Sequence, residues 1–177
     1  MTSTLQLFAD EFLESAGAIV FNSDKTQIVI LYSSSKNEYL LPKGRRNVTE
    51  SRAEAALREV KEETGYICHL VPITMKTRAP PADEKGFTPD VAVERECMSD
   101  PFALTIREEE KRKRKIIWWF VAQVENDGTA MSMPSWFDAH FTPEWRSVEE
   151  AMQALTYQSD RELVARASTL VAPATNK

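Results

Sequence analysis

One segment constrains the fold more than any other, because it carries a full set of helix start and stop signals. Ser51 and Glu54 stand three residues apart, which is the spacing of a capping box. Gly65 is the residue type that best ends a helix. The spacing therefore predicts a helix over residues 51–65. Residues on one side of this helix form its predicted core face: Ala53, Leu57, Val60 and Thr64.

The opposite side of the predicted helix is strongly acidic. At about 100° per residue, Glu59, Glu62 and Glu63 fall within an arc of roughly 100°. Arg58 lies one turn before Glu62, within ion-pairing distance. Glutamate-rich helices are most often solvated surfaces. A hard divalent cation such as Mg²⁺ would, however, remove the repulsion among these carboxylates, and it would suit chemistry on phosphates.

The rest of the chain is typical of short strands and two further helices. Apolar, β-branched runs predict strands over 16–21, 27–32, 39–41, 67–76, 102–106 and 116–124, the first two as a hairpin. Helical spacing predicts helices over 148–155 and 161–170. Residues 80–96 and 125–143 are predicted irregular, and 5–13 is ambiguous between helix and strand. This order predicts an α/β (α+β) fold with a mixed sheet.

Length and charge narrow the class of protein. A chain of 177 residues fits a single domain, 1–177, with an N-terminal extension of roughly residues 1–14. The net charge of −5 argues against a nucleic-acid partner, and no apolar run reaches the length of about 18 residues that crosses a membrane. Residues 1–17 lack the basic start of a secretory signal. We therefore expect a cytoplasmic protein, although a nuclear or a processed secreted one is also compatible.

The acidic helix belongs to a longer pattern that runs from Gly44 to Tyr66, GRRNVTESRAEAALREVKEETGY. Its specified residues are Gly44, Glu50, Arg58, Glu59, Val60, Glu62, Glu63 and Gly65. The pattern resembles the signature of the Nudix hydrolases position for position. Only Tyr66 departs from it, at a slot where the family usually has an aliphatic residue. The resemblance implies a Nudix-type α/β/α sandwich with a loop-helix-loop catalytic motif. It also implies hydrolysis of pyrophosphate bonds with Mg²⁺, or with Mn²⁺ in its place.

The resemblance also assigns roles by matching position. It implies that Glu59 and Glu63 bind the metal, with Glu62 sharing the metal or activating water, and that the Gly44 carbonyl is a further ligand. Arg58, together with Glu50, would orient these carboxylates. Family members differ in which residue is the general base, and some use a glutamate outside the signature. Within the signature, the general base stays open between Glu62 and Glu63.

Residues outside the signature bear on the substrate. The segments VILYSSS (29–35) and YLLPKG (39–44) resemble the branch that cleaves diphosphoinositol polyphosphates and diadenosine polyphosphates. Basic side chains just before the helix, whose N-terminus itself favours anions, suit such densely charged small molecules. A second basic run could add positive field, or could be a solvated turn neutralised by residues 108–110. The predicted substrate-binding residues are Lys43, Arg45, Arg46, Ser34, Ser35, Lys113 and Lys115.

Two other hypotheses stay open. Pro80 and Pro81 lie near the place where relatives that cleave ADP-ribose often carry a proline, so ADP-ribose or another substrate linked through a nucleoside diphosphate is the second candidate. A non-catalytic module that binds a nucleotide on the same fold is the third. The retention of every acidic residue of the signature disfavours this third hypothesis. The oligomeric state is not indicated by the sequence.

Overall fold

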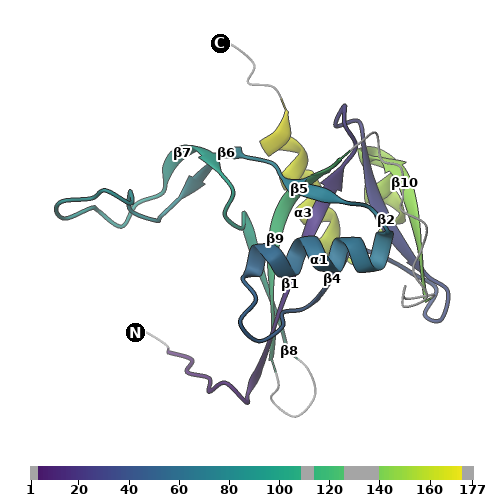
Figure 1. Ribbon diagram of the computed structural model, residues 1–177, viewed down its shortest axis with the longest axis horizontal. Coiled ribbons are helices and arrows are strands. Elements are labelled where there is room, and N and C mark those ends of the chain that lie inside the picture. The colour runs from purple at the N-terminus through teal and green to yellow at the C-terminus, as the bar shows by residue number, and fades with distance from the viewer. Residues whose placement is uncertain (1–3, 109–113, 126–139, 173–177) are drawn as a thin grey trace.

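A computed structural model describes residues 4–108, 114–125 and 140–172 of the chain. Figure 1 shows the main sheet with helix α1 (Arg52–Thr64) across one face and α3 (Gln158–Val171) on the other. A short helix, α2 (Val148–Ala154), lies on the same side as α3. No helix in the described part of the chain is long and apolar enough to cross a membrane.

The main sheet is mixed and has β1 (Phe12–Phe21) at its centre. Within the described residues it has eight strands. β1 pairs antiparallel with β2 (Gln27–Ser33) and β4 (Lys43–Arg45), and parallel with β9 (Arg114–Val124). The outer strands complete the sheet: β3 (Glu38–Leu40) and β10 (Phe141–Ser147) pair with β2, and β5 (Cys68–Leu70) and β8 (Ala103–Glu108) pair with β9.

Alternation along the two central strands builds a core on each face of the sheet. Side chains at successive strand positions point to opposite faces. Ala16, Ala18 and Phe120 accordingly pack with the helix α1. Ile117 and Trp119 pack with α2 and α3, and both are fully buried. The predicted α/β fold with a mixed sheet is therefore confirmed.

Several predicted elements are confirmed, and three differ. The first hairpin and all three helices form where they were predicted, although α3 begins at Gln158. Residues 67–76 do not form one strand. They are divided into β5 and β6 (Ile73–Thr77) at Pro72, which lacks the N–H that a continuous strand needs.

The two predicted irregular stretches each contain part of a strand. Residues 80–96 include the start of β7 (Val93–Met98), which pairs with β6 in a separate two-stranded sheet. Figure 1 shows this β6–β7 arm extending away from the main sheet. β10 begins at Phe141, inside the predicted stretch 125–143. It contains Pro143, which an edge strand with one paired side tolerates.

The N-terminal segment is not helical. Of residues 5–13, only Phe12 and Leu13 belong to a strand, as the start of β1. The sheet therefore begins within the predicted N-terminal extension. The last residues of that extension pair with the start of β9, with Glu14 opposite Ile116.

Candidate active site

Helix α1 begins and ends as its sequence predicts. The Ser51 hydroxyl accepts a hydrogen bond from the Glu54 N–H at 3.1 Å, and the Glu54 carboxylate accepts one from the Ser51 N–H at 2.8 Å. Gly65 ends the helix with a left-handed φ of 76°. The predicted core face is corrected in part. Ala55 and Ala56 are fully buried with Val60 and Thr64, whereas the predicted Ala53 and Leu57 are only partly buried.

With this face of α1 buried, Glu59 and Glu63 lie against strand β4. The Lys43 N–H donates to Glu63 Oε2 at 2.8 Å. A β-carbon added at Gly44 would overlap the Glu59 carboxylate, so this carboxylate lies directly over the glycine backbone. β4 is itself fixed to the central strand, with Gly44 opposite Ala16. The glycine of the signature is thus needed because a carboxylate occupies the place of its side chain.

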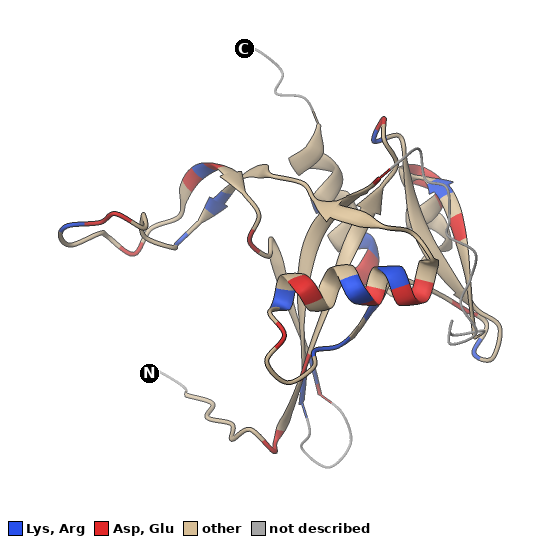
Figure 2. Ribbon diagram, viewed as in Figure 1, with Lys and Arg blue, Asp and Glu red and all other residues tan. Residues whose placement is uncertain are grey.

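Arg58 holds the other acids of the site together. Its guanidinium donates five hydrogen bonds of 2.7–3.0 Å: two to Glu50, one each to Glu59 and Glu62, and one to the Arg45 carbonyl. Glu50 also accepts the Asn47 N–H at 2.9 Å, which closes the loop before the helix. Figure 2 shows acidic and basic residues in close succession along α1. One arginine therefore aligns three carboxylates that would otherwise repel each other.

Burial and pairing act in opposite directions on these groups. Burial raises the pKa of the Glu59 carboxyl despite the hydrogen bond from Arg58. Hydrogen bonds from Arg58 lower the pKa of Glu50. The same carboxylates, Glu50 first, raise the pKa of Arg58, which stays charged. The site therefore combines one acid whose ionised form is stabilised, Glu50, with one whose ionisation is opposed by burial, Glu59.

The oxygen atoms of this group fit a hard divalent cation in kind. Within the described residues, no three His, Cys, Asp or Glu side chains already converge on one metal position. Arg58, however, uses one oxygen each of Glu59 and Glu62, and no hydrogen bond of the described residues engages Glu59 Oε2 or Glu62 Oε1. These free oxygens, together with Glu63 and the Gly44 carbonyl, are the donors that a metal ion would use.

The cations predicted to bind substrate are placed differently from one another. Lys43 and Arg45 lie in β4 on either side of Gly44, over whose backbone the Glu59 carboxylate lies. Arg46 instead forms an ion pair with Glu14 at 2.8 Å and donates to the Glu50 carbonyl at 2.7 Å, so it also braces the loop. Lys115 lies in β9, opposite Arg107 of β8. Lys113 lies outside the described residues.

The two predicted serines are not brought to the carboxylates. Ser34 and Ser35 are exposed in the turn between β2 and β3, where the Ser35 hydroxyl lies 3.3 Å from that of Ser33. Among the described residues, no hydrogen bond joins either serine to the acids of α1. Their assignment to substrate binding stays a prediction without support from a contact.

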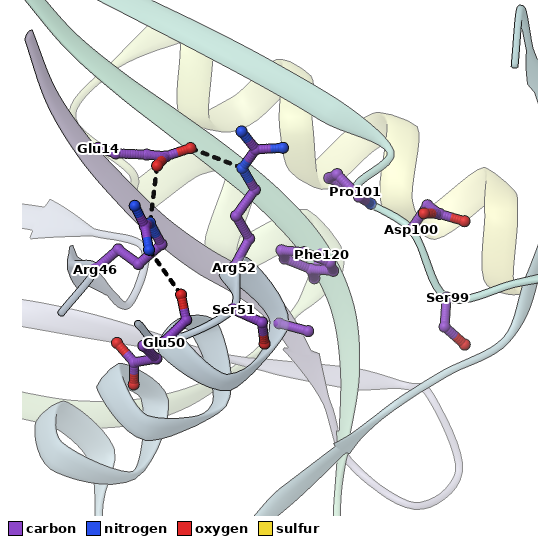
Figure 3. Close-up of a pocket in the computed structure, with 10 residues that line it drawn as sticks. Glu14, Arg46, Glu50, Ser51, Arg52, Ser99, Asp100, Pro101 and Phe120 are labelled. Atoms are coloured by element: carbon purple, nitrogen blue, oxygen red, sulfur yellow. Dashed lines mark hydrogen bonds and ion pairs between the residues drawn. The ribbon is translucent and has the colours of Figure 1, made fainter. Parts of the chain in front are cut away.

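Glu14 is a part of the site's surroundings that the sequence analysis missed. Its carboxylate accepts hydrogen bonds from Arg46, Arg52 and the Trp118 indole at 2.7–2.8 Å, and the Arg52 guanidinium stacks on the Trp118 ring. Figure 3 shows Glu14, Arg46 and Arg52 in a pocket of about 480 Å³ beside the start of α1. A lone glutamate in a segment predicted to be an extension gave no signal of this role.

The chain was compared with known proteins and structures. The NUDIX domain model matches residues 11–167. Over 61 residues the chain is 38% identical to nudix hydrolase 1 of Caenorhabditis elegans, a stretch that covers 32% of this chain and only 17% of that protein. The matching stretch is therefore only a small part of that relative.

Solved structures share the fold at low identity. The C. elegans Ap4A hydrolase superposes with a TM-score of 0.61 at 18% identity, over 90% of this chain and 98% of that one. A NUDIX family hydrolase from Clostridium perfringens gives 0.61 at 16% identity, over 93% and 100%. Because the domain model covers most of the chain and the fold agrees, the protein belongs to the Nudix family, whose enzymes are pyrophosphatases that typically depend on divalent metal ions.

Proposed function

We propose that this protein is a Mg²⁺-dependent pyrophosphohydrolase that cleaves diphosphate linkages in highly phosphorylated small molecules. The supporting observation is the Arg58 network, which gathers Glu50, Glu59 and Glu62, while the Lys43 N–H holds Glu63. Three acids drawn around one arginine, with two carboxylate oxygens unengaged, suit a site that accepts a further cation. When bound, Mg²⁺ would neutralise phosphate charge and acidify water.

The residues of the chain divide the remaining work. Glu59, Glu62, Glu63 and the Gly44 carbonyl would hold the ion. Arg58 and Glu50 keep the carboxylates oriented, since Arg58 donates one hydrogen bond to a single oxygen of Glu59 and one to a single oxygen of Glu62. Glu62 is the more exposed of these two acids, with 39% of its side chain accessible against 13% for Glu59. Water therefore reaches Glu62 more easily than Glu59, which makes Glu62 one candidate base, and Glu63 is the other.

Diphosphoinositol polyphosphates and diadenosine polyphosphates are the first candidate substrates. Lys43 and Arg45 flank Gly44 in β4, and both classes of molecule carry several phosphates next to the bond that is cleaved. The resemblance of segments 29–35 and 39–44 to enzymes of that branch agrees with this charge. The Ap4A hydrolase from C. elegans shares only the fold and does not by itself decide the substrate.

ADP-ribose has less support. The prolines that suggested it, Pro80 and Pro81, follow β6 in the arm that Figure 1 shows extending away from the main sheet. No described hydrogen bond or ion pair connects these prolines to the acids of α1. A non-catalytic module would bind nucleotides without releasing product, and this outcome separates it from an enzyme.

A substrate panel tests the proposal. The protein is incubated with a diphosphoinositol polyphosphate, diadenosine tetraphosphate and ADP-ribose, with Mg²⁺ or with EDTA, and the products are separated by ion-exchange chromatography. We expect Mg²⁺-dependent cleavage of the first or second substrate, lost in Glu63→Gln and kept in Glu149→Gln, which alters an exposed acid of α2. Cleavage that persists in EDTA or in Glu63→Gln would refute the proposed site, and binding of the panel without cleavage would indicate the non-catalytic module.

A further inference from the structure

A group of cations lies on the face of the sheet opposite to α1. Lys43 connects this face to the acids, because its N–H bonds Glu63 while its side chain leaves toward the other side. A β-carbon built at Gly17 would lie 2.6 Å from Lys43 Cβ and 2.9 Å from the Trp119 ring, which packs against α3. Alternation along β4 directs the Arg45 side chain to this same face.

Strands β8 and β9 add two further cations beside them. Arg107 contacts Asp160 of α3, with Nη2 and Oδ1 3.4 Å apart, so its side chain is on the α3 face. Lys115 stands directly opposite Arg107 in the ladder, and residues directly opposite in an antiparallel pair share a face. The α3-face cation group therefore consists of Lys43, Arg45, Arg107 and Lys115.

Arg107 lies between a buried acid and an aromatic ring. Asp160 is 1% exposed and pairs with Arg107, while Glu38 accepts the hydroxyl of Tyr157, over whose ring Arg107 lies at 5.3 Å. Burial raises the pKa of the Asp160 carboxyl, and the nearby charges of Arg107 and Lys43 oppose this rise, so both cations lie near one buried acid.

Hydrogen bonding on this face is incomplete as well. Two buried polar atoms, Ser15 Oγ and Asp160 Oδ2, have no hydrogen-bond partner among the described residues. Both belong to this face, since Ser15 lies opposite Arg45 on one side and Ile117 on the other. Apart from the bond to Asp160, no hydrogen bond of the described residues engages the Arg107 guanidinium, which is about one third exposed. Such unmet polar groups are rare in folded proteins, and an ordered water or a bound ligand can supply the partner.

These contacts point to a role for the α3-face cation group in substrate binding, and this role rests on the proposed function. We propose that Arg107 and Lys43 bind phosphates of the substrate next to the diphosphate that is cleaved, and that Asp160 positions Arg107 for this contact. A substrate whose diphosphate lies at Glu59 and Glu63 reaches this face across Lys43, which contacts both sides. The buried Asp160 uses one N–H of the guanidinium and leaves the others for a phosphate, which arginine binds through paired N–H groups.

Binding of a polyanion that contains no diphosphate bond tests the proposal without turnover. Inositol hexakisphosphate is titrated calorimetrically into the 177-residue wild-type protein and into Arg107→Gln, Arg107→Lys and Arg114→Gln. Arg114 is the matched control, because it lies one residue before Lys115, points to the other face and pairs with Glu108. We expect about tenfold weaker binding for Arg107→Gln, partial recovery for Arg107→Lys and no change for Arg114→Gln. Equal binding by wild type and Arg107→Gln, or equal losses in Arg107→Gln and Arg114→Gln, would overturn the proposal.

Kinetics with diadenosine tetraphosphate separate this inference from the proposed function. If the wild type cleaves it, Arg107→Gln and Asp160→Asn are both expected to raise KM by about tenfold with kcat within about twofold. The double variant should be no worse than Arg107→Gln alone, because Asp160 acts through Arg107. An active wild type with an unchanged KM in Arg107→Gln refutes the inference alone, whereas a wild type inactive on the whole panel refutes the proposed function. Thermal unfolding of each variant identifies a loss that comes only from misfolding.

Discussion

Replacing Arg58 by glutamine should both destabilise the fold and increase the stabilising effect of a divalent cation. The substitution removes the partner of Glu50, Glu59 and Glu62, whose side chains are 14%, 13% and 39% exposed. Removing one partner from a buried ion pair costs about 3–5 kcal/mol. Solvent screens part of this loss, because Arg58 is itself 25% exposed, so we expect about 2–4 kcal/mol. That corresponds to a fall in Tm of about 5–15 °C.

Thermal unfolding with and without Mg²⁺ measures both effects. In Arg58→Gln the carboxylates lose the charge that compensates them, so Mg²⁺ should raise its Tm more than it raises that of the wild type. Arg78→Gln is the control, because Arg78 pairs with Asp90 in a bridge whose side chains are 66% and 80% exposed, and its Tm should not change measurably. A loss in Arg58→Gln no larger than in Arg78→Gln, or equal Mg²⁺ shifts in wild type and Arg58→Gln, would contradict this account of the network.

Three further substitutions test separate parts of the structure. Gly44→Ala should abolish turnover while lowering Tm only slightly, because the new methyl group displaces the flexible Glu59 carboxylate; an active variant would refute the contact. Ser51→Ala should cost about 1 kcal/mol in denaturant unfolding through loss of the capping hydrogen bond, and an unchanged midpoint would contradict it. Glu14→Gln should lower Tm at about pH 7 but much less at about pH 3. Burial opposes ionisation of Glu14, but the hydrogen bonds from its arginine partners outweigh burial and lower its pKa. The ionised Glu14 therefore stabilises the fold at pH values above its ordinary pKa of 4.5. This stabilisation is lost as the pH falls through the lowered pKa of the folded protein. Equal differences at both pH values would refute that assignment.

The sequence predicted the helix that carries the acids because its signals are local. Ser51, Glu54 and Gly65 act within a few residues of one another, so their spacing alone specifies where α1 begins and ends. The acidic face follows from the same periodicity. The exact core face does not, because the packing of α1 on β1 decides that Ala55 and Ala56 are buried in preference to Ala53 and Leu57.

Elements that depend on distant partners were harder to predict. The start of β10, which contains Pro143, was predicted to be irregular, yet it belongs to a strand because β2 accepts it as an edge partner. The three-residue strand β4 is too short to give a pattern, although it places Gly44 below Glu59. No local pattern marks Glu14 or Arg107 in the sequence, and only the sheet register reveals which residues they contact.

Binding of Mn²⁺, followed by electron paramagnetic resonance, tests the central claim most directly. Free Mn²⁺ gives a sharp signal that is lost on binding, so the ion can be counted without any substrate or turnover. Wild-type protein is expected to remove Mn²⁺ from the free pool in competition with Mg²⁺, and Glu59→Gln and Glu63→Gln are each expected to weaken this binding at least tenfold. Equal binding by wild type and both variants, with each variant folded by its thermal transition, would show that the carboxylates of α1 do not hold the cation.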